Sequence, residues 1–302
     1  MNKIKFMLTA LALAALAIAG CEKDNQILNS ASQESELTQA NAGLDKTSSE
    51  QILYAITTSN RLLKFSSNRP GRILSERRVT GLQHGEMLLG IDFRPFNGKL
   101  YGLGSSSRLY VIETATGVAT AVGGQPFSPG LQGKAFGFDF NPTVDRIRVV
   151  SNSGQNLRLH PDLGTVVDFD ANTPGIQTDG PLAYTSTDAN AGKAPIVVGA
   201  AYTNPDNDPN TGTTLYDLDA ALDLLTIQNP PNNGTLNTVG ALGLNFDKLV
   251  GFDIAPSGIA YATRQGAENL RLVSVNLVTG AVTLMGTIET RKAINGLAAP
   301  TL

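Results

Sequence analysis

The stretch "GFDFNP" at residues 137–142 decides the fold, because the chain repeats it in two variant forms. These are "GIDFRP" at 90–95 and "GFDIAP" at 251–256, and all three read glycine, apolar, aspartate, apolar, any residue, proline. Alternation of apolar and polar residues is typical of a β-strand, whose successive side chains point to opposite faces. Each copy therefore predicts a strand that ends at a proline-containing turn.

Each copy opens a unit of four short runs rich in β-branched and aromatic residues, separated by turns of glycine, asparagine, aspartate or proline. The step from Gly90 to Gly137 is 47 residues, and the step from Gly251 to Gly296 is 45. A period of about 40–50 residues with four strands per unit is the pattern of a β-propeller. We therefore predict that residues 50–302 form one all-β domain, a β-propeller.

The two ends of this domain predict how the ring closes. The first unit, residues 52–80, has three runs but no opening motif, whereas "INGLAAP" at 294–300 is an opening motif with nothing after it. The C-terminal strand is expected to complete the N-terminal blade, which removes two exposed sheet edges.

The spacing of the openings predicts five four-stranded blades, with openings at 90, 137, about 180 ("GPLAYTS"), 251 and 296. The fourth unit is long, about 71 residues, and insertions are expected near 187–194 and 226–238. A sixth blade within this unit is therefore the alternative. The run "LYDLDAALDLL" at 215–225 comes closest to a helical period, but its place in the repeat fits a third strand and turn better.

The first 20 residues carry the pattern of an export signal. Lys3 and Lys5 precede an apolar run of 13 residues, Met7 to Ala19, interrupted by one threonine. Such a run is too short to span a bilayer and has the length of a signal-peptide core. It ends in "IAGC" at 18–21, which resembles a bacterial lipobox and implies cleavage before Cys21 and acylation of this cysteine. An ordinary secretory signal with an incidental cysteine is the alternative.

Residues 22–49 predict a flexible tether, because they are polar and their few apolar residues follow no period. "CEKDN" places charged residues directly after Cys21, which resembles a signal that sends some bacterial lipoproteins to the cell surface; a solvated tether is the alternative. The expected organisation is a signal peptide (1–20), a lipidated cysteine and tether (21–49) and the propeller (50–302). The expected location is the bacterial cell envelope, at the outer membrane.

Composition narrows the set of partners. Cys21 is the one cysteine of the chain, so the mature protein can form no internal disulfide. Removal of Lys3 and Lys5 leaves 21 basic against 26 acidic residues, a net charge of −5. A mildly acidic chain argues against nucleic-acid binding, which needs a basic patch. The expected partners are the membrane, through the lipid anchor, and an unidentified protein or polysaccharide.

The opening motifs also carry a family resemblance. "GFDFNPTVDRIRVVSNSGQNLRLHPDLG" at 137–164 resembles the core motif of DUF4394, a bacterial family defined as a domain of unknown function, and "LLGIDFRPFNGKLYGLG" at 88–104 resembles an earlier motif of the same family. The resemblance extends over most of residues 51–300. It implies a propeller-like, secreted or envelope domain, and it implies no activity and no catalytic residues.

The three repeated aspartates, Asp92, Asp139 and Asp253, are the candidate site, because they share one register on the strands expected to lie innermost. In a functional role they would form a ring of carboxylates near the central channel. Such a ring could bind a cation such as calcium or a polar ligand, or supply the acid and base of a glycosidase-like hydrolase.

In a structural role, each aspartate would accept hydrogen bonds from the turn of its own blade or pair with an arginine, since a buried carboxylate needs such partners. The candidate arginines are Arg94, Arg146 and Arg148. Repetition favours the structural role, because a stabilising contact is needed once per blade whereas a catalytic one rarely repeats.

Other chemistry has few candidates. His84 and His160 lie in different units, so a zinc or copper site is not expected, and no GxSxG elbow suggests a serine nucleophile. "DNDPNTG" at 206–212 spaces its acids like the start of a calcium loop, but its glycine comes one position late and the distal glutamate is missing. A polar hairpin loop is therefore predicted there. No catalytic residue, metal site or cofactor is predicted, with calcium as the alternative.

Aromatic residues do not indicate a sugar-binding surface. The chain has no tryptophan, and Tyr54, Tyr101 and Tyr261 fall at repeated second-strand positions that predict core packing. The predicted function is a non-catalytic binding or scaffolding module, and a hydrolase using the channel carboxylates is the alternative. Geometry separates the two, since the paired carboxylates of glycosidases lie about 5–9.5 Å apart in an open pocket.

Overall fold

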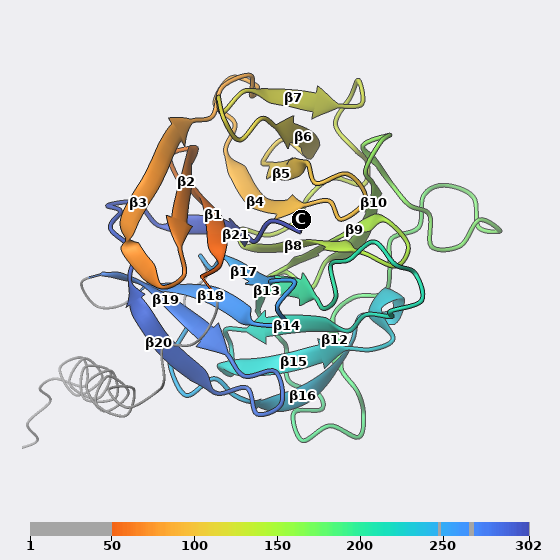
Figure 1. The fold of residues 1–302 in the computed structure, drawn as a ribbon. Coiled ribbons are helices and arrows are strands. Elements are labelled where there is room, and N and C mark those ends of the chain that lie inside the picture. The colour runs from red at the N-terminus through yellow and green to blue at the C-terminus, as the bar shows by residue number, and fades with distance from the viewer. Residues whose placement is uncertain (1–49, 247–248, 266–268, 302) are drawn as a thin grey trace, which may run out of the picture.

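The computed structural model describes residues 50–301 except 247–248 and 266–268. Within this part of the chain, five β-sheets stand around a central axis, as Figure 1 shows. The prediction of an all-β propeller with five blades is confirmed, and the six-blade alternative is wrong because the strands form five sheets. The predicted signal peptide, Cys21 and the tether lie outside the described residues. None of the helices in the described part of the chain is long and apolar enough to cross a membrane.

The blades follow one another along the chain, and the strands of each blade are named from the innermost outward. Blade 1 comprises β21 (Ile294–Ala298), β1 (Ile52–Thr57), β2 (Arg61–Ser66) and β3 (Arg69–Arg78). Blade 2 comprises β4 (Leu88–Phe93), β5 (Leu100–Gly104), β6 (Arg108–Ile112) and β7 (Ala119–Val122). Blade 3 comprises β8 (Phe136–Asn141), β9 (Arg146–Ser151), β10 (Asn156–His160) and β11 (Thr165–Val166).

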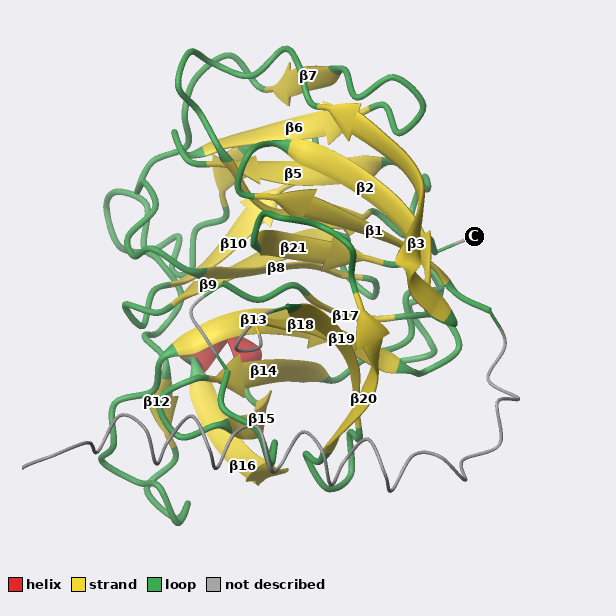
Figure 2. Cartoon of the chain, turned by 90° about the vertical axis from the view of Figure 1, so that its left-hand side faces the viewer, coloured by secondary structure: helices red, strands yellow, loops and turns green. Residues whose placement is uncertain are grey.

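Blade 4 comprises β13 (Val197–Tyr202), β14 (Leu215–Asp219), β15 (Leu224–Gln228), β16 (Thr235–Ala241) and an added outer strand, β12 (Ala183–Tyr184). A short 3-10 helix, η2 (Pro231–Asn233), lies between β15 and β16. Blade 5 comprises β17 (Phe252–Ile254), β18 (Ala260–Gln265), β19 (Leu270–Val275) and β20 (Val282–Thr287). In the side view of Figure 2 the sheets stack around the axis with loops at both ends.

The C-terminal strand closes the ring as predicted. β21 pairs with β1 in antiparallel register, with Ala298 opposite Tyr54 and Leu297 opposite Ala55. The same strand contacts the innermost strands of its two neighbouring blades, β4 and β17. The first blade is therefore built from both ends of the domain, and the whole ring is contained in residues 50–301.

The fourth blade differs from the prediction. The opening expected at about 180 is wrong, because Ala183–Tyr184 form the outer strand β12, which pairs in parallel with β16. The innermost strand is β13, in "VVGAAYTNP", where Gly199 approaches the axis and Ala201 stands in place of the aspartate. The run at 215–225 forms the second strand, a turn and the start of the third strand, and 226–238 belongs mostly to β15 and β16 rather than to an insertion.

Five glycines set how closely the blades approach the axis. Each one packs against the innermost strand of the next blade: Gly90, Gly137, Gly199, Gly251 and Gly296. A Cβ at Gly137 would lie 2.5 Å from the backbone nitrogen of Ala200, and a Cβ at Gly251 would lie 2.7 Å from that of Leu297. No other residue fits there without displacing backbone, which explains the glycine of the opening motif.

The hydrophobic core lies between the blades, one cluster for each pair of neighbours. Both faces of every sheet are therefore buried over much of their area, which is why the inner strands read as nearly continuous apolar runs. Tyr54, Tyr101 and Tyr261 belong to these clusters, at 8 %, 3 % and 0 % exposure, so their prediction as core residues is confirmed.

Replacement of an axial glycine is expected to destabilise the ring severely. Gly251→Ala places a methyl group against the backbone of the next blade, and overpacking of this kind costs about 3 kcal/mol. For a domain of this size that lowers the melting temperature by about 6–12 °C. Gly124→Ala is the matched control, because a Cβ there meets nothing within 4 Å. Equal melting temperatures for the two variants would contradict the close axial packing.

Candidate functional site

The three repeated aspartates converge at the axis. Asp92, Asp139 and Asp253 come from β4, β8 and β17, and one carboxylate oxygen from each lies within 4.8 Å of the others. All three are buried, at 5 %, 3 % and 5 % exposure. In the two remaining blades the same register holds Ala201 and Ala298. The prediction of one shared register on the innermost strands is confirmed.

The carboxylates accept hydrogen bonds from five backbone N–H groups, one in each blade. In every case the donor is the residue that follows the aspartate or its alanine counterpart. Asp92 accepts from Phe93 (2.7 Å) and Phe140 (2.8 Å), Asp139 from Tyr202 (2.9 Å), and Asp253 from Ile254 and Ala299 (both 2.6 Å).

These bonds explain why three aspartates serve five blades. Each aspartate reaches the N–H of the next blade, and Asp92 and Asp253 also bind the N–H of their own blade. The inner N–H groups of blades 2 and 5 need an acceptor from their own blade. The blades that precede them carry Ala298 and Ala201 in place of the aspartate. The inner edge of a sheet leaves such groups unpaired, and burying them unpaired is costly. The predicted structural role therefore fits, but the bonds cross between blades instead of returning to each blade's own turn.

The charge of the cluster is reduced by its surroundings. Burial raises the pKa of Asp92 and Asp139 well above the usual range, and nearby carboxyl groups raise it further. Burial also raises the pKa of Asp253, to about 7, against the effect of its N–H donors. Asp139 has one backbone donor where the others have two, and its side chain hydrogen-bonds Asp253. Asp139 is therefore the member with a carboxyl oxygen free of backbone donors, and the cluster as a whole favours protonated carboxyl groups.

The arginines suggested as partners of the aspartates bind other groups. Arg94 is 3 % exposed and pairs with Asp145 at 2.5 Å and Asp162 at 2.6 Å, which ties blade 2 to blade 3. Arg148 pairs with Asp179 at 2.5 Å. Arg146 donates to backbone carbonyl groups of its own turn. The arginine alternative for the axial aspartates is therefore wrong: Arg94 and Arg148 pair with loop carboxylates, and among the described residues Arg146 donates to backbone carbonyl groups.

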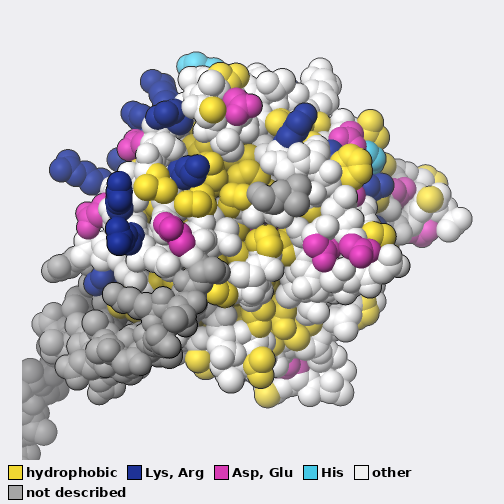
Figure 3. Space-filling model, viewed as in Figure 1, with side chains coloured by type: hydrophobic (Ala, Val, Ile, Leu, Met, Phe, Trp, Pro, Cys, Tyr) yellow, Lys and Arg dark blue, Asp and Glu magenta, His cyan; other side chains and the backbone are white. Residues whose placement is uncertain are grey.

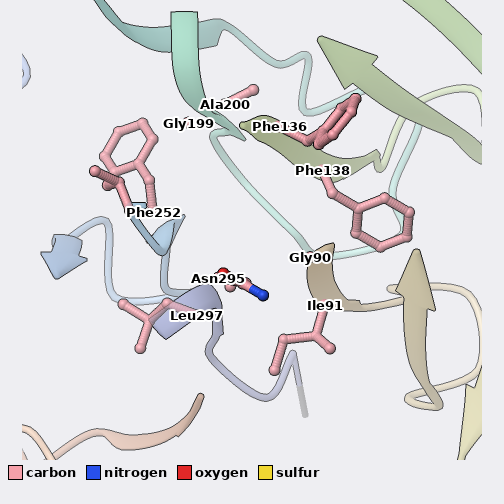
Figure 4. A pocket seen from close by; sticks show the side chains of 12 residues that line it. Gly90, Ile91, Phe136, Phe138, Gly199, Ala200, Phe252, Asn295 and Leu297 are labelled. Carbon is pink, nitrogen blue, oxygen red and sulfur yellow. The ribbon is translucent and has the colours of Figure 1, made fainter. Parts of the chain in front are cut away.

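The axis has little free space on the glycine side of the cluster. The cavity lined by the axial glycines and their neighbours measures about 10 Å³, room for about one water molecule. Figure 4 shows Asn295 in the middle of this cavity, between Gly90, Phe252 and Leu297. At the opposite end, Ala299 and Thr301 follow β21 and are buried at 2 % and 7 % exposure. The carboxylates are thus enclosed on both sides.

The donor set fits the five N–H groups better than a cation. Calcium takes six to eight oxygen ligands at about 2.3–2.6 Å from ionised or carbonyl groups. At the axis, three carboxyl groups with raised pKa values converge among apolar residues, and five of their six oxygens already accept an N–H. Asp92, Asp139 and Asp253 are nevertheless the residues of the described chain that could hold an ion.

The other sequence candidates do not join this cluster. Residues 206–212 form part of the exposed loop between β13 and β14, where Asp206 and Asp208 accept backbone N–H groups of the same loop. His84 is exposed, and His160 ends β10, where its Nδ1 accepts the N–H of Asp162. In the described part of the chain, neither histidine belongs to a group of potential metal ligands.

Sequence reasoning missed four buried acids, Glu86, Asp179, Asp217 and Asp219, of which Asp217 of β14 is the one without a hydrogen-bond partner among the described residues. Its side chain is fully buried. Burial raises its pKa to about 8, although the charge of Arg148 acts in the opposite direction. Within "LYDLD" the residue sits in an ordinary strand pattern, so nothing in the sequence marks it as buried rather than exposed.

The model of the family described as "Domain of unknown function (DUF4394)" matches residues 61–298. The chain belongs to this family. The match extends from β2 to β21, so it includes every strand of this DUF4394 propeller except β1. The family resemblance of the opening motifs is confirmed. No curated protein sequence matches the chain.

Solved structures resemble the DUF4394 propeller at low sequence identity. A protein of unknown function from Bacteroides thetaiotaomicron is 16% identical, with TM-score 0.43, over 82% of this chain and 60% of that one. Catalytically inactive virginiamycin B lyase from Staphylococcus aureus with quinupristin is 10% identical, with TM-score 0.40, over 82% of this chain and 73% of that one. Dihydro-heme d1 dehydrogenase NirN is 11% identical, with TM-score 0.37, over 80% of this chain and 46% of that one. The chain thus spans about half the length of two of these proteins.

The hydrogen bonds predict unequal effects of three similar substitutions. In Asp92→Asn or Asp253→Asn the amide accepts one N–H and leaves the second unpaired, at a cost of about 1–3 kcal/mol. Asp139→Asn can still accept the N–H of Tyr202 and donate to Asp253, so its cost is below about 1 kcal/mol. Chemical denaturation of the three variants measures this order. Equal losses, together with stabilisation of the wild type by millimolar calcium, would instead indicate a cation site.

The buried acids predict that stability falls as pH rises. Below about pH 4 the carboxyl group of Asp217 is protonated in both states, whereas up to about pH 8 it stays protonated in the folded state and ionises in the unfolded one. The free energy of unfolding therefore decreases across this interval and levels off above it. Asp217→Asn should flatten the decrease, because an amide does not titrate. Denaturation curves from pH 4 to about pH 9 test this, and an unchanged slope would show that Asp217 is not buried as an acid.

Proposed function

We propose that this chain is a cell-envelope lipoprotein whose propeller is a non-catalytic binding or scaffolding module. Acylation of Cys21 would hold it to the membrane, and the propeller would present one face of the ring to a partner protein. The composition of the N-terminal segment supports the anchor. The arrangement of the axis and the loops supports the binding role.

The observation that carries this proposal is the use of the axial carboxylates by the backbone. Five of their six oxygens accept N–H groups, and the cluster is enclosed. Glycosidases hold their two carboxylates about 5–5.5 Å or 6.5–9.5 Å apart around a bound sugar. In this protein the closest oxygens lie within 4.8 Å, and the neighbouring cavity has room for about one water molecule. This geometry speaks against the hydrolase alternative at the axis.

The face of the ring at which β21 ends, which we call the C-terminal face, offers a binding surface. It carries the turns between first and second strands and between third and fourth strands of each blade. Five exposed aliphatic or aromatic side chains lie in these turns: Phe96, Val118, Val144, Leu163 and Val278. Apolar side chains also surround the centre of this face in Figure 3. Scattered aliphatic groups of this kind match the surface of a protein better than a sugar ring, which stacks on aromatic platforms.

Site-specific photo-crosslinking in the native host tests the binding role. A photoreactive residue at Phe96 or Val144 should crosslink to one partner protein of constant mass. Met87 is the control site, because it is 46% exposed, similar to the loop residues, but precedes an innermost strand and lies on the opposite face. Absence of crosslinks at both loop positions, or the same products at Met87, would contradict binding on the C-terminal face.

The anchor is tested in the same cells with Cys21→Ser. The wild type should fractionate with membranes and incorporate labelled fatty acid, and the variant should do neither. A variant that stays membrane-bound and labelled would overturn the lipoprotein assignment without affecting the crosslinking result.

A further inference from the structure

Charge is segregated around the ring. Residues 51–85 contain six basic residues and one acidic residue, whereas residues 160–225 contain one basic and ten acidic residues. The first segment forms the three outer strands of blade 1, and the second runs from blade 3 into blade 4. In Figure 3 the lysines and arginines gather on the left, over β2 and β3, together with some acidic side chains, whereas acidic side chains predominate on the right. The propeller therefore has a basic edge.

The basic edge is centred on the outermost strand of blade 1. β3 carries four exposed arginines, and β2 adds Arg61, which is exposed, and Lys64, which is half-buried. The arginines of β3 are Arg69, Arg72, Arg77 and Arg78. At ten residues, β3 is about 33 Å long, so the charges are spread along one side of the ring.

Protection of a sheet edge does not account for these arginines. Charged residues often prevent outer strands from pairing with other chains. The outer strands of the other four blades, however, contain no charged residue: β7 reads ATAV, β11 TV, β12 AY and β20 VTLMGT. The outer edges of these four sheets thus carry no charge on the edge strand itself. The presence of four arginines on β3 therefore requires another explanation.

The positive charge of the basic edge is poorly neutralised within the protein. Arg61 lies directly opposite Arg78 across the β2–β3 pair, and like charges in this position repel. Glu76 is the one acidic residue on these two strands and pairs with Arg61 at 3.6 Å, with both side chains about half exposed. Glu289, which follows β20, lies beside Gly71 of β3, so two acidic side chains face six basic ones. Arg69, Arg72 and Arg78 form no hydrogen bond or ion pair through their side chains with any described residue. An anionic surface would relieve this repulsion.

We propose that the basic edge, residues Arg61, Lys64, Arg69, Arg72, Arg77 and Arg78, docks on the phosphate headgroups of an anionic lipid surface. This inference deepens the proposed function and rests on its lipid anchor. The chain enters the described domain at residue 50, next to β1, so the proposed anchor leads directly into the same blade. A long, exposed strand with a row of arginines matches a planar array of phosphates, and each such residue adds to the attraction.

Docking through the basic edge would set the ring on its side. β3 lies at the perimeter and runs between the two faces, so a membrane that contacts it leaves both faces open to solvent (Figure 1). The C-terminal face would then stand roughly perpendicular to the lipid surface, where a partner can reach it.

Cosedimentation with vesicles tests the docking without the anchor. Residues 50–302 contain the closed ring and its core, so this domain can be purified by itself. It should bind phosphatidylcholine vesicles that contain about a third of phosphatidylglycerol, and binding should fall steeply between about 50 mM and 500 mM salt. Vesicles of phosphatidylcholine alone should bind little. The triple variant Arg69→Glu, Arg72→Glu, Arg78→Glu should lower the apparent affinity at least about tenfold.

The matched control changes the same net charge elsewhere. Lys99→Glu, Lys134→Glu and Lys193→Glu replace three exposed lysines of other blades and loops, and this variant should bind nearly as well as the wild type. Equal losses in both triple variants would overturn the proposal, because net charge rather than the basic edge would then drive binding. Absence of binding to anionic vesicles would also overturn the proposal. So would binding to dextran sulfate, a soluble anionic polymer, without binding to the vesicles. Neither result would bear on the Cys21→Ser fractionation, so the anchor and the docking can fail separately.

Discussion

The close approach of the five innermost strands at the axis is the constraint on which the rest of this structure depends. A Cβ at any of the five axial glycines would lie within 2.9 Å of an atom of the next blade. The approach also turns the unpaired inner edge of each sheet toward the axis, where water has little access. Backbone N–H groups in that position need acceptors, since burying them unpaired costs about 1–3 kcal/mol each. The opening motif supplies both requirements, with glycine for the approach and aspartate as the acceptor.

Three carboxylates satisfy five N–H groups because each acts across a blade boundary. Asp92 and Asp253 are followed or preceded in the ring by blades that carry alanine, and they accept two N–H groups each. A fourth or fifth aspartate would add buried charge without adding a needed acceptor, since burial and then the neighbouring carboxyl groups already raise the pKa of Asp139. The pattern of three aspartates and two alanines therefore suits a chain that must satisfy its backbone and limit repulsion. Chemistry that needs ionised, accessible carboxylates is poorly served by such a cluster.

The sequence predicted much of the fold because period and alternation are local signals. It located the innermost strands at Gly90, Gly137, Gly251 and Gly296 and the closing role of the last one. It failed in blade 4, where Ala201 replaces the aspartate and Gly180 imitates an opening although its neighbour is the backbone of Asn233. It also placed the aspartates correctly but gave them the wrong partners. Which backbone N–H groups face the axis depends on ring closure, which involves all five blades. The burial of Asp217 likewise depends on a non-local contact, the packing between blades 3 and 4.

With the axis committed to stability, the proposed binding and docking roles fall on surfaces that the ring does not need for closure. Substitutions in the turns of the C-terminal face and on β3 leave the glycines, the carboxylates and the core clusters untouched, so these surfaces are free to differ between relatives of the same fold. The two surfaces are also geometrically independent, since one lies at an end of the ring and the other at its perimeter (Figure 1). A membrane at the perimeter does not obstruct a partner at the end. In the proposed arrangement, the propeller could therefore contact the membrane and bind a partner at the same time.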